Sequence, residues 1–267
     1  MAASDVVSAR AQQRLLTSMF KPEAEDEKYQ ILEVIGKGGF GEVNKVQCRI
    51  SGQLKAMKRL PFDVTRLDND ILLREIQNIL QIKPDKNILQ WFDIFRTRNN
   101  QLAIVMELCD SDLEGYWSKN EVRGLKNGFR IAVQAAQGVV FLHTHNPQII
   151  HRDLKPQNIL IRKLGDEIVI KISDFGISSS SSSSSAVTTG EISNYATKED
   201  IARLINVMKT TAGHGTWPFM APELCAGRDG VGLVDGKLVY DASVDIFALG
   251  QVFNYIFCYN DSDYGAC

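Results

Sequence analysis

Residues 151–158, with the sequence HRDLKPQN, constrain this chain more than any other part of it. Two apolar runs follow them and predict short strands joined at the turn Leu164-Gly165-Asp166, after which comes Asp174-Phe175-Gly176. A given set of seven fixed residues has a chance frequency of about one in a billion per position. The combination is therefore a motif and not a coincidence.

The composition places the chain among soluble globular proteins. Of its 267 residues, 44% are hydrophobic and 23% charged, which excludes disordered, collagen-like and disulfide-scaffold classes. A net charge of -2 offers no basic field for nucleic acid or an anionic membrane. The five cysteines are scattered without CxxC spacing, which fits a reducing compartment and gives no structural zinc site.

The N-terminus MAASDVVSAR lacks the long apolar stretch of a secretory signal, and Ala2 removes the N-myristoylation signal. We therefore expect a cytoplasmic protein, with the nucleus as the alternative. Residues 1–28 carry an apolar helical stripe and a charged linker. They predict a flexible N-terminal extension, with a membrane or partner helix as the alternative.

The pattern then changes from strands to helices along the chain. Five strand-like runs lie between Tyr29 and Glu107, the first three as an antiparallel meander, with one helix after the third. Residues 129–145 and 244–259 predict helices. The second is apolar nearly all round, but it contains Asp245 and falls short of the ~18–20 residues of a membrane span, so we expect it in a protein core.

The predicted meander carries a glycine loop and an inward-facing lysine. Gly36, Gly38 and Gly41 match G-x-G-x-x-G between two strands, which fits neither a dinucleotide site nor a Walker loop. Without Cβ atoms the loop backbone can approach phosphates closely; an ordinary hairpin tip is the alternative. Lys58 falls on the apolar face of its strand by period two, where its ammonium needs a carboxylate, and Glu75 is available.

Taken together, these motifs resemble those of the eukaryotic protein kinase family, serine/threonine type. The resemblance runs in the family's order: GKGGFGEV, AMK, the helix glutamate, ELC, HRDLKPQN, DFG, APE and DIFALG. It implies an α+β, bilobal protein-kinase fold. The implied parts are an N-lobe at 29–108 with a small antiparallel β-sheet and one helix, a mainly helical C-lobe at 109–267 lacking its last helices, and a long Ser-rich activation segment at 174–223.

The resemblance also implies a role for each motif residue. Asp153 would accept or orient the substrate hydroxyl proton, and Lys155 would steady the transferring phosphoryl group. Lys58, held by Glu75, would pair with the α- and β-phosphates of ATP. The implied ligands of Mg²⁺, or alternatively Mn²⁺, are Asn158 and Asp174. The other implied nucleotide contacts are Ile35, Gly36, Gly38, Gly39, Phe40, Gly41, Val43, Ala56, Met106, Glu107, Cys109 and Leu160.

The function so implied is transfer of the γ-phosphoryl group of Mg-ATP to serine or threonine hydroxyls of a protein substrate in intracellular signalling, with no nucleic acid and no membrane span. A nucleotide-binding, pseudokinase-like module or scaffold without phosphotransfer is the alternative. Within the family, ELCDSDLEGYW and VDIFALGQVFNYIF look most like the unfolded-protein-response kinase–endoribonucleases, although RNase activity is not carried over.

The sequence departs from the family's pattern near its end. Only nine residues follow Cys258, and they contain no arginine to pair with Glu223. We therefore expect the chain to be a fragment, a truncated product or a lobe that a partner or missing segment completes, with an apolar face of helix 244–259 left uncovered.

Overall fold

The structure is a computed structural model of the chain. It describes residues 22–23, 25–38, 41–60, 82–99, 101–119, 124–146, 148–174, 217–222, 233–234, 237–238 and 241–258. The chain divides into two compact units between Leu108 and Cys109, and residues 82–89 go with the second unit. Both units contain strands and helices, which confirms the predicted α+β fold class. The predicted helix with Glu75, the loop tip Gly39–Phe40, the serine run and Glu223 lie outside the described residues.

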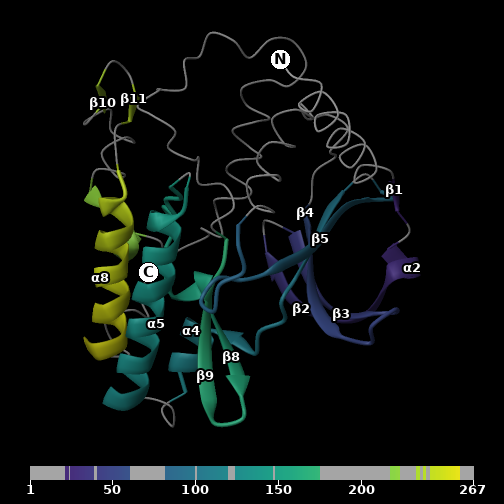
Figure 1. Cartoon of the computed structure of the whole chain (residues 1–267), viewed down its shortest axis with the longest axis horizontal. Coiled ribbons are helices and arrows are strands. Elements are labelled where there is room, and N and C mark those ends of the chain that lie inside the picture. Colours follow the sequence, from purple (N-terminus) through teal and green to yellow (C-terminus); the bar gives the residue numbers. More distant parts are fainter. Residues whose placement is uncertain are drawn as a thin grey trace, which may run out of the picture. The chain divides into compact units, whose positions relative to one another are not determined.

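A six-stranded sheet in the order β1-β5-β6-β4-β3-β2 forms the first unit (Figure 1). Its elements are β1 (Pro22–Glu23), α2 (Glu25–Lys28), β2 (Tyr29–Gly38), β3 (Gly41–Cys48), β4 (Leu54–Leu60), β5 (Trp91–Thr97) and β6 (Leu102–Met106). Strands β2, β3 and β4 form the predicted antiparallel meander. Strand β1 was not predicted: it pairs in parallel with β5, so this part of the expected extension is attached to the sheet.

One face of this sheet carries an apolar core. Alternation along the strands puts the core side chains on the same face, as expected from a two-residue period. The buried members of the cluster are Tyr29, Val46, Met57, Phe95, Ala103 and Val105. Positions on the opposite face are therefore left for the residues that the sequence assigns to nucleotide binding.

The second unit combines helices with a small sheet. Its main elements are β7 (Ser111–Asp112), α4 (Leu113–Trp117), α5 (Leu125–Thr144), η3 (Pro156–Asn158), β8 (Ile159–Leu164), β9 (Glu167–Ile172), η4 (Trp217–Phe219), β10 (Leu233–Val234), β11 (Lys237–Leu238) and α8 (Ser243–Cys258). Helix α5 contacts both β9 and α8, and Figure 1 shows α8 running alongside α5. Both predicted helices and the predicted hairpin are confirmed, although α5 begins at Leu125 instead of residue 129.

Glycines allow α5 to approach its two neighbours closely. A Cβ atom on Gly138 would lie 2.6 Å from Cδ1 of Ile172 and 3.1 Å from the carbonyl oxygen of Asn87. A Cβ atom on Gly128 would lie 2.9 Å from the ring of Phe257. These three distances are too short for a larger side chain without a shift, so the packing of α5 depends on the two glycine positions.

Helix α8 is buried on one side only. Its buried residues include Val244, Asp245 and Val252, whereas Ile246 and Phe257 remain 55% and 41% exposed. An exposed apolar face was expected here; its cover by a further segment or a partner stays a prediction. In the part of the chain that the structure describes, none of the helices combines the length and the apolar character needed to cross a membrane.

Candidate active site

The predicted site residues divide between the two units. The first unit contains Ile35, Gly36, Gly38, Gly41, Val43, Ala56, Lys58, Met106 and Glu107. The second contains Cys109, Asp153, Lys155, Asn158, Leu160 and Asp174. Gly39, Phe40 and Glu75 lie outside the described residues. Each unit therefore carries its own part of the predicted set.

In the first unit, the strand register brings the nucleotide-binding candidates to one face of the sheet. Gly36 pairs with Val43, and Val43 pairs with Lys58. Two residues before Lys58 on β4, Ala56 pairs with Met106 of β6. Directly opposed residues of antiparallel strands point to the same side, so these side chains share one face. Lys58 thus lies on the face that the two-residue period predicted.

The segment after β6 offers backbone groups at the end of that face. The N–H of Glu107 donates to the carbonyl oxygen of Gln90 at 2.9 Å. That N–H is therefore in use, and only the carbonyl group of Glu107 can face an adenine edge. The sequence also assigns Cys109, two positions further along the chain, to the nucleotide, and Cys109 belongs to the second unit.

In the second unit, a buried aspartate of α8 fixes the backbone of the motif loop 151–158. Asp245 is fully buried, and its Oδ2 accepts from the N–H of His151 at 2.7 Å. Its Oδ1 accepts from the N–H of Arg152, also at 2.7 Å. Nε2 of His143 lies 2.8 Å from Oδ2 of the same carboxylate. One carboxylate thus joins the end of α5, the motif loop and α8.

These contacts keep Asp245 ionised despite its burial. Burial opposes the charged form, but the hydrogen bond from His143, the Coulombic interaction with His151 and two backbone N–H donors outweigh it. The pKa of the Asp245 carboxyl therefore lies below its ordinary value of 3.8. At neutral pH the loop is held by an anion, and hydrogen bonds to a charged acceptor are stronger than those to a neutral one.

Inside the loop, two side chains converge on Asp153. Nζ of Lys155 lies 2.9 Å from Oδ2 of Asp153, and the Lys155 side chain is only 4% exposed. Nδ2 of Asn158 donates to the same Oδ2 at 3.0 Å and to the carbonyl oxygen of Asp153 at 2.7 Å. The carboxylate is consequently fixed through one oxygen, which leaves Oδ1 as the atom that can meet a substrate.

The hairpin β8–β9 brings the second motif back to the first. The backbone N–H and the hydroxyl of Ser173 both donate to the carbonyl oxygen of Asn158, at 2.9 and 3.1 Å. Asp174 follows directly, so the backbone segments that carry the two predicted metal ligands lie close together. Within the described residues, Arg152 and Asp174 are the two non-glycine positions with positive φ, at 68° and 57°. Such strain is typical of functional positions in a protein.

The donor set fits Mg²⁺. Because Nδ2 of Asn158 is engaged by Asp153, the amide oxygen is the atom that remains for a cation. This oxygen and the Asp174 carboxylate are hard ligands, as Mg²⁺ requires. No cluster of three or more His, Cys, Asp or Glu side chains occurs among the residues that the structure describes. Two protein ligands are what Mg²⁺ commonly takes when phosphates and water complete its shell.

Sequence reasoning missed the two side chains that support the loop from outside. Asp245 entered it only as an argument against a membrane span, and His143 was not considered. The available signal was the carboxylate itself, because a charged residue within an apolar helix must have strong partners when it is buried. The sequence did not indicate which residues these partners are, because they lie 93 to 102 positions away from Asp245.

Comparison with known proteins agrees with this geometry. A protein kinase domain matches residues 29–262, and the chain therefore belongs to the eukaryotic protein kinase family, as its motifs predicted. It is 35% identical over 230 residues to mouse cyclin-dependent kinase-like 4 and 34% identical over 230 residues to the human protein. It is 30% identical over 234 residues to serine/threonine-protein kinase 36 of Pongo abelii.

These alignments cover 85% of this chain but unequal parts of the relatives. The chain spans 56% of the mouse and 50% of the human cyclin-dependent kinase-like protein, and 14% of serine/threonine-protein kinase 36. The name of serine/threonine-protein kinase 36 agrees with the predicted serine/threonine type. The resemblance to the kinase–endoribonucleases stays a prediction.

Proposed function

We propose that the chain is a serine/threonine protein kinase that transfers the γ-phosphoryl group of Mg-ATP to a protein hydroxyl. The observation that carries this proposal is the fixation of Asp153 by Lys155 and Asn158 through one oxygen, 2.9 and 3.0 Å away. Such positioning is what phosphoryl transfer needs, because the protein contributes geometry and electrostatics and little covalent chemistry.

In the proposed reaction, Asp153 orients the substrate hydroxyl and receives its proton. The hydroxyl oxygen attacks the γ-phosphorus, the bond to the β–γ bridging oxygen breaks, and ADP leaves with that bond's electron pair. Lys155 is well suited to contact the negatively charged phosphoryl group during its transfer. Its side chain is almost completely buried, with the carboxylate of Asp153 beside the ammonium, so an anionic phosphoryl group would add a favourable contact.

Mg²⁺, when bound, neutralises charge on the ATP phosphates. Asn158 and Asp174 would hold it through their amide and carboxylate oxygens. The ammonium group of Lys58 would place a further positive charge beside the phosphates. Lys58 lies on the same sheet face as Ala56 and Met106. Val43 and Ala56, which share that face, would flank the adenine.

The decisive experiment is Asp153→Asn, which keeps size and hydrogen bonding but removes the base. We expect transfer from Mg-ATP to a generic serine/threonine substrate to fall by about 10²–10⁴-fold. Binding of Mg-ATP, measured as a rise in melting temperature, should survive. Saturation at a hundred times Kd stabilises a folded protein by about 2.7 kcal/mol, which is easily measured.

Asp166→Asn is the matched control, since Asp166 lies exposed in the β8–β9 turn. Its transfer rate should equal that of the unchanged chain. If the unchanged chain binds Mg-ATP but transfers nothing, the alternative of a nucleotide-binding module is correct. A transfer rate insensitive to Asp153→Asn would show that another group is the base.

A further inference from the structure

A surface hollow of about 440 Å³ lies on the second unit, outside the proposed active site. Helix α5, the start of β9 and the segment before β5 form it. Its lining residues are Lys86, Phe129, Arg130, Val133, Gln134, Glu167 and Ile168. None of these residues belongs to the predicted catalytic, nucleotide-binding or metal-binding set, so the hollow has no role in the function proposed above.

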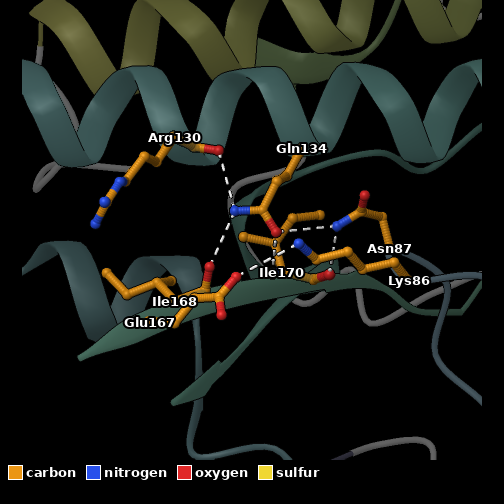
Figure 2. A network of polar contacts seen from close by, with 7 residues as sticks. All are labelled: Lys86, Asn87, Arg130, Gln134, Glu167, Ile168 and Ile170. Carbon is orange, nitrogen blue, oxygen red and sulfur yellow. Dashed lines mark hydrogen bonds and ion pairs between the residues drawn. The ribbon is translucent and has the colours of Figure 1, made fainter. Parts of the chain in front are cut away.

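A saturated hydrogen-bond network holds the base of the hollow in shape (Figure 2). Nε2 of Gln134 donates to the carbonyl oxygens of Arg130 and Ile168, at 3.2 and 3.0 Å. Its Oε1 accepts from Nδ2 of Asn87 and from the N–H of Ile170, at 3.1 and 3.2 Å. Every hydrogen-bonding position of the Gln134 amide is therefore occupied. The base joins three chain segments and leaves recognition to the walls and the rim.

The walls are apolar and open. Phe129 and Val133 are 60% and 53% exposed, whereas Ile168 is buried behind them. Small-molecule sites usually enclose most of their ligand, which walls this exposed cannot do. A peptide lying across the hollow would instead bury these side chains along its own length. The shape thus favours an extended or helical peptide segment over a small molecule.

The charged rim determines the sign of the partner. Lys86 and Arg130 contribute two positive charges against the single negative charge of Glu167. Nζ of Lys86 lies 3.5 Å from Oε1 of Glu167, but both side chains are more than 60% exposed, so this ion pair is weak and exchangeable. Figure 2 shows the Arg130 side chain pointing away from the Gln134 network.

The start of α5 adds to this positive rim. Gly124, before the first turn, provides no side-chain cap, and the turn contains no acidic residue. Lys126 lies in that turn, four positions before Arg130 and hence on the same side of the helix. Among the residues that the structure describes, no acidic side chain of this first turn offsets the positive end of the helix dipole.

We infer that this hollow is a docking site for an acidic peptide segment of a partner protein, one that places an apolar side chain between Phe129 and Val133 and carboxylates beside Lys86 and Arg130. The inference does not depend on phosphotransfer, and either can fail while the other holds.

The test is fluorescence anisotropy of three labelled dodecapeptides with the full chain. The first carries a Leu-Leu pair flanked on each side by two glutamates, the second has lysines for the glutamates, and the third has serines for the leucines. We expect the first to bind and both others to bind at least tenfold more weakly. Equal binding of the acidic and basic peptides, or no binding of the acidic peptide, would overturn the inference.

Charge variants then locate the site. Arg130→Glu should weaken the acidic peptide about tenfold, and Glu167→Gln should strengthen it about threefold because it removes the opposing carboxylate. The matched control is Arg98→Glu, which makes the same charge change in the first unit, where Arg98 is 65% exposed. Melting temperatures verify that each variant is folded. An equal loss with Arg98→Glu would show attraction by net charge alone and contradict a site at the hollow.

Discussion

The motif loop 151–158 and the glycine hairpin β2–β3 both carry predicted ligand contacts, but they are held in opposite ways. In the loop, His151, Lys155 and Asn158 are at most 4% exposed, and the backbone is bonded to Asp245 of a distant helix. Strand β2 lies at the edge of its sheet, and its aliphatic residues are 44% to 54% exposed. Its register with β3 also shifts at two places.

The difference follows from the task that each segment is proposed to perform. A base and a phosphate-binding lysine act through placement, so contacts from elements far apart in the sequence must fix them. A loop that covers a ligand has to admit and release it, and a backbone ladder with one neighbour permits such adjustment at low cost. Long-range anchoring in one region and local pairing in the other are thus the expected division.

The largest effect should come from removing the anchor of the loop. Asp245→Asn leaves backbone N–H groups of the loop facing an amide instead of a carboxylate. We expect the free energy of unfolding to fall by about 3 kcal/mol, measured by urea denaturation. Asp241→Asn is the matched control, because Asp241 lies exposed before the same helix and its side chain accepts a hydrogen bond from the backbone N–H of Ser243. Equal effects of the two substitutions would show that the buried anchor is unimportant.

The same anchor predicts a specific acid response. Its folded-state pKa lies below the ordinary value of 3.8, so the ionised form stabilises the fold above that pH. This contribution is lost as the pH falls through the lower folded-state pKa. The stability difference between the unchanged chain and Asp245→Asn should therefore shrink between pH 5 and the acid limit of folding, measured by urea titrations at each pH. A difference that stays constant over this range would be the contrary result.

A smaller loss is expected where α5 packs against the hairpin that leads to Asp174. In Gly138→Ala the new methyl group would meet Ile172 and the carbonyl oxygen of Asn87. We expect the free energy of unfolding to fall by about 1–2 kcal/mol. Gly250→Ala is the control on α8, because no atom lies within 4 Å of the added Cβ, and it should stabilise by about 0.5–1 kcal/mol. If both substitutions changed the free energy of unfolding in the same direction, the close packing around Gly138 would not explain the effect of Gly138→Ala.

The smallest change in the free energy of unfolding is expected for a contact on the glycine hairpin. Lys45 and Glu33 form an ion pair of 2.9 Å between β3 and β2, with side chains 31% and 58% exposed. Lys45→Met should change the free energy of unfolding by less than about 0.5 kcal/mol, because an exposed ion pair gains little in water. Thermal and urea denaturation both measure this change. A loss above about 1 kcal/mol would show that side chains, and not only the backbone ladder, hold the edge strand.

Local signals made the fold class and the motif loop predictable. The meander followed from strand-like runs joined by tight turns, and the β8–β9 hairpin followed from a Gly-containing turn. Helix α5 followed from apolar spacing, and α8 from a run that is apolar nearly all round. The turn at Gly165 shows why: its φ of 61° is a conformation that favours glycine. The sequence could not reveal which residues pair when they lie far apart along the chain. Strand β1 adds to β5, and Asn87 bonds to Gln134 and Ile170 across 47 and 83 positions.

The distance between the motif loop and Asp245 also orders the events of synthesis. The loop is made first, and its anchor follows 94 residues later. At about 5–20 residues per second, the ribosome needs roughly 5–20 s to supply it. During that interval the nascent chain holds the loop residues without the carboxylate that shapes them. The proposed catalytic geometry is therefore acquired late, only when α8 has been completed and has packed against α5.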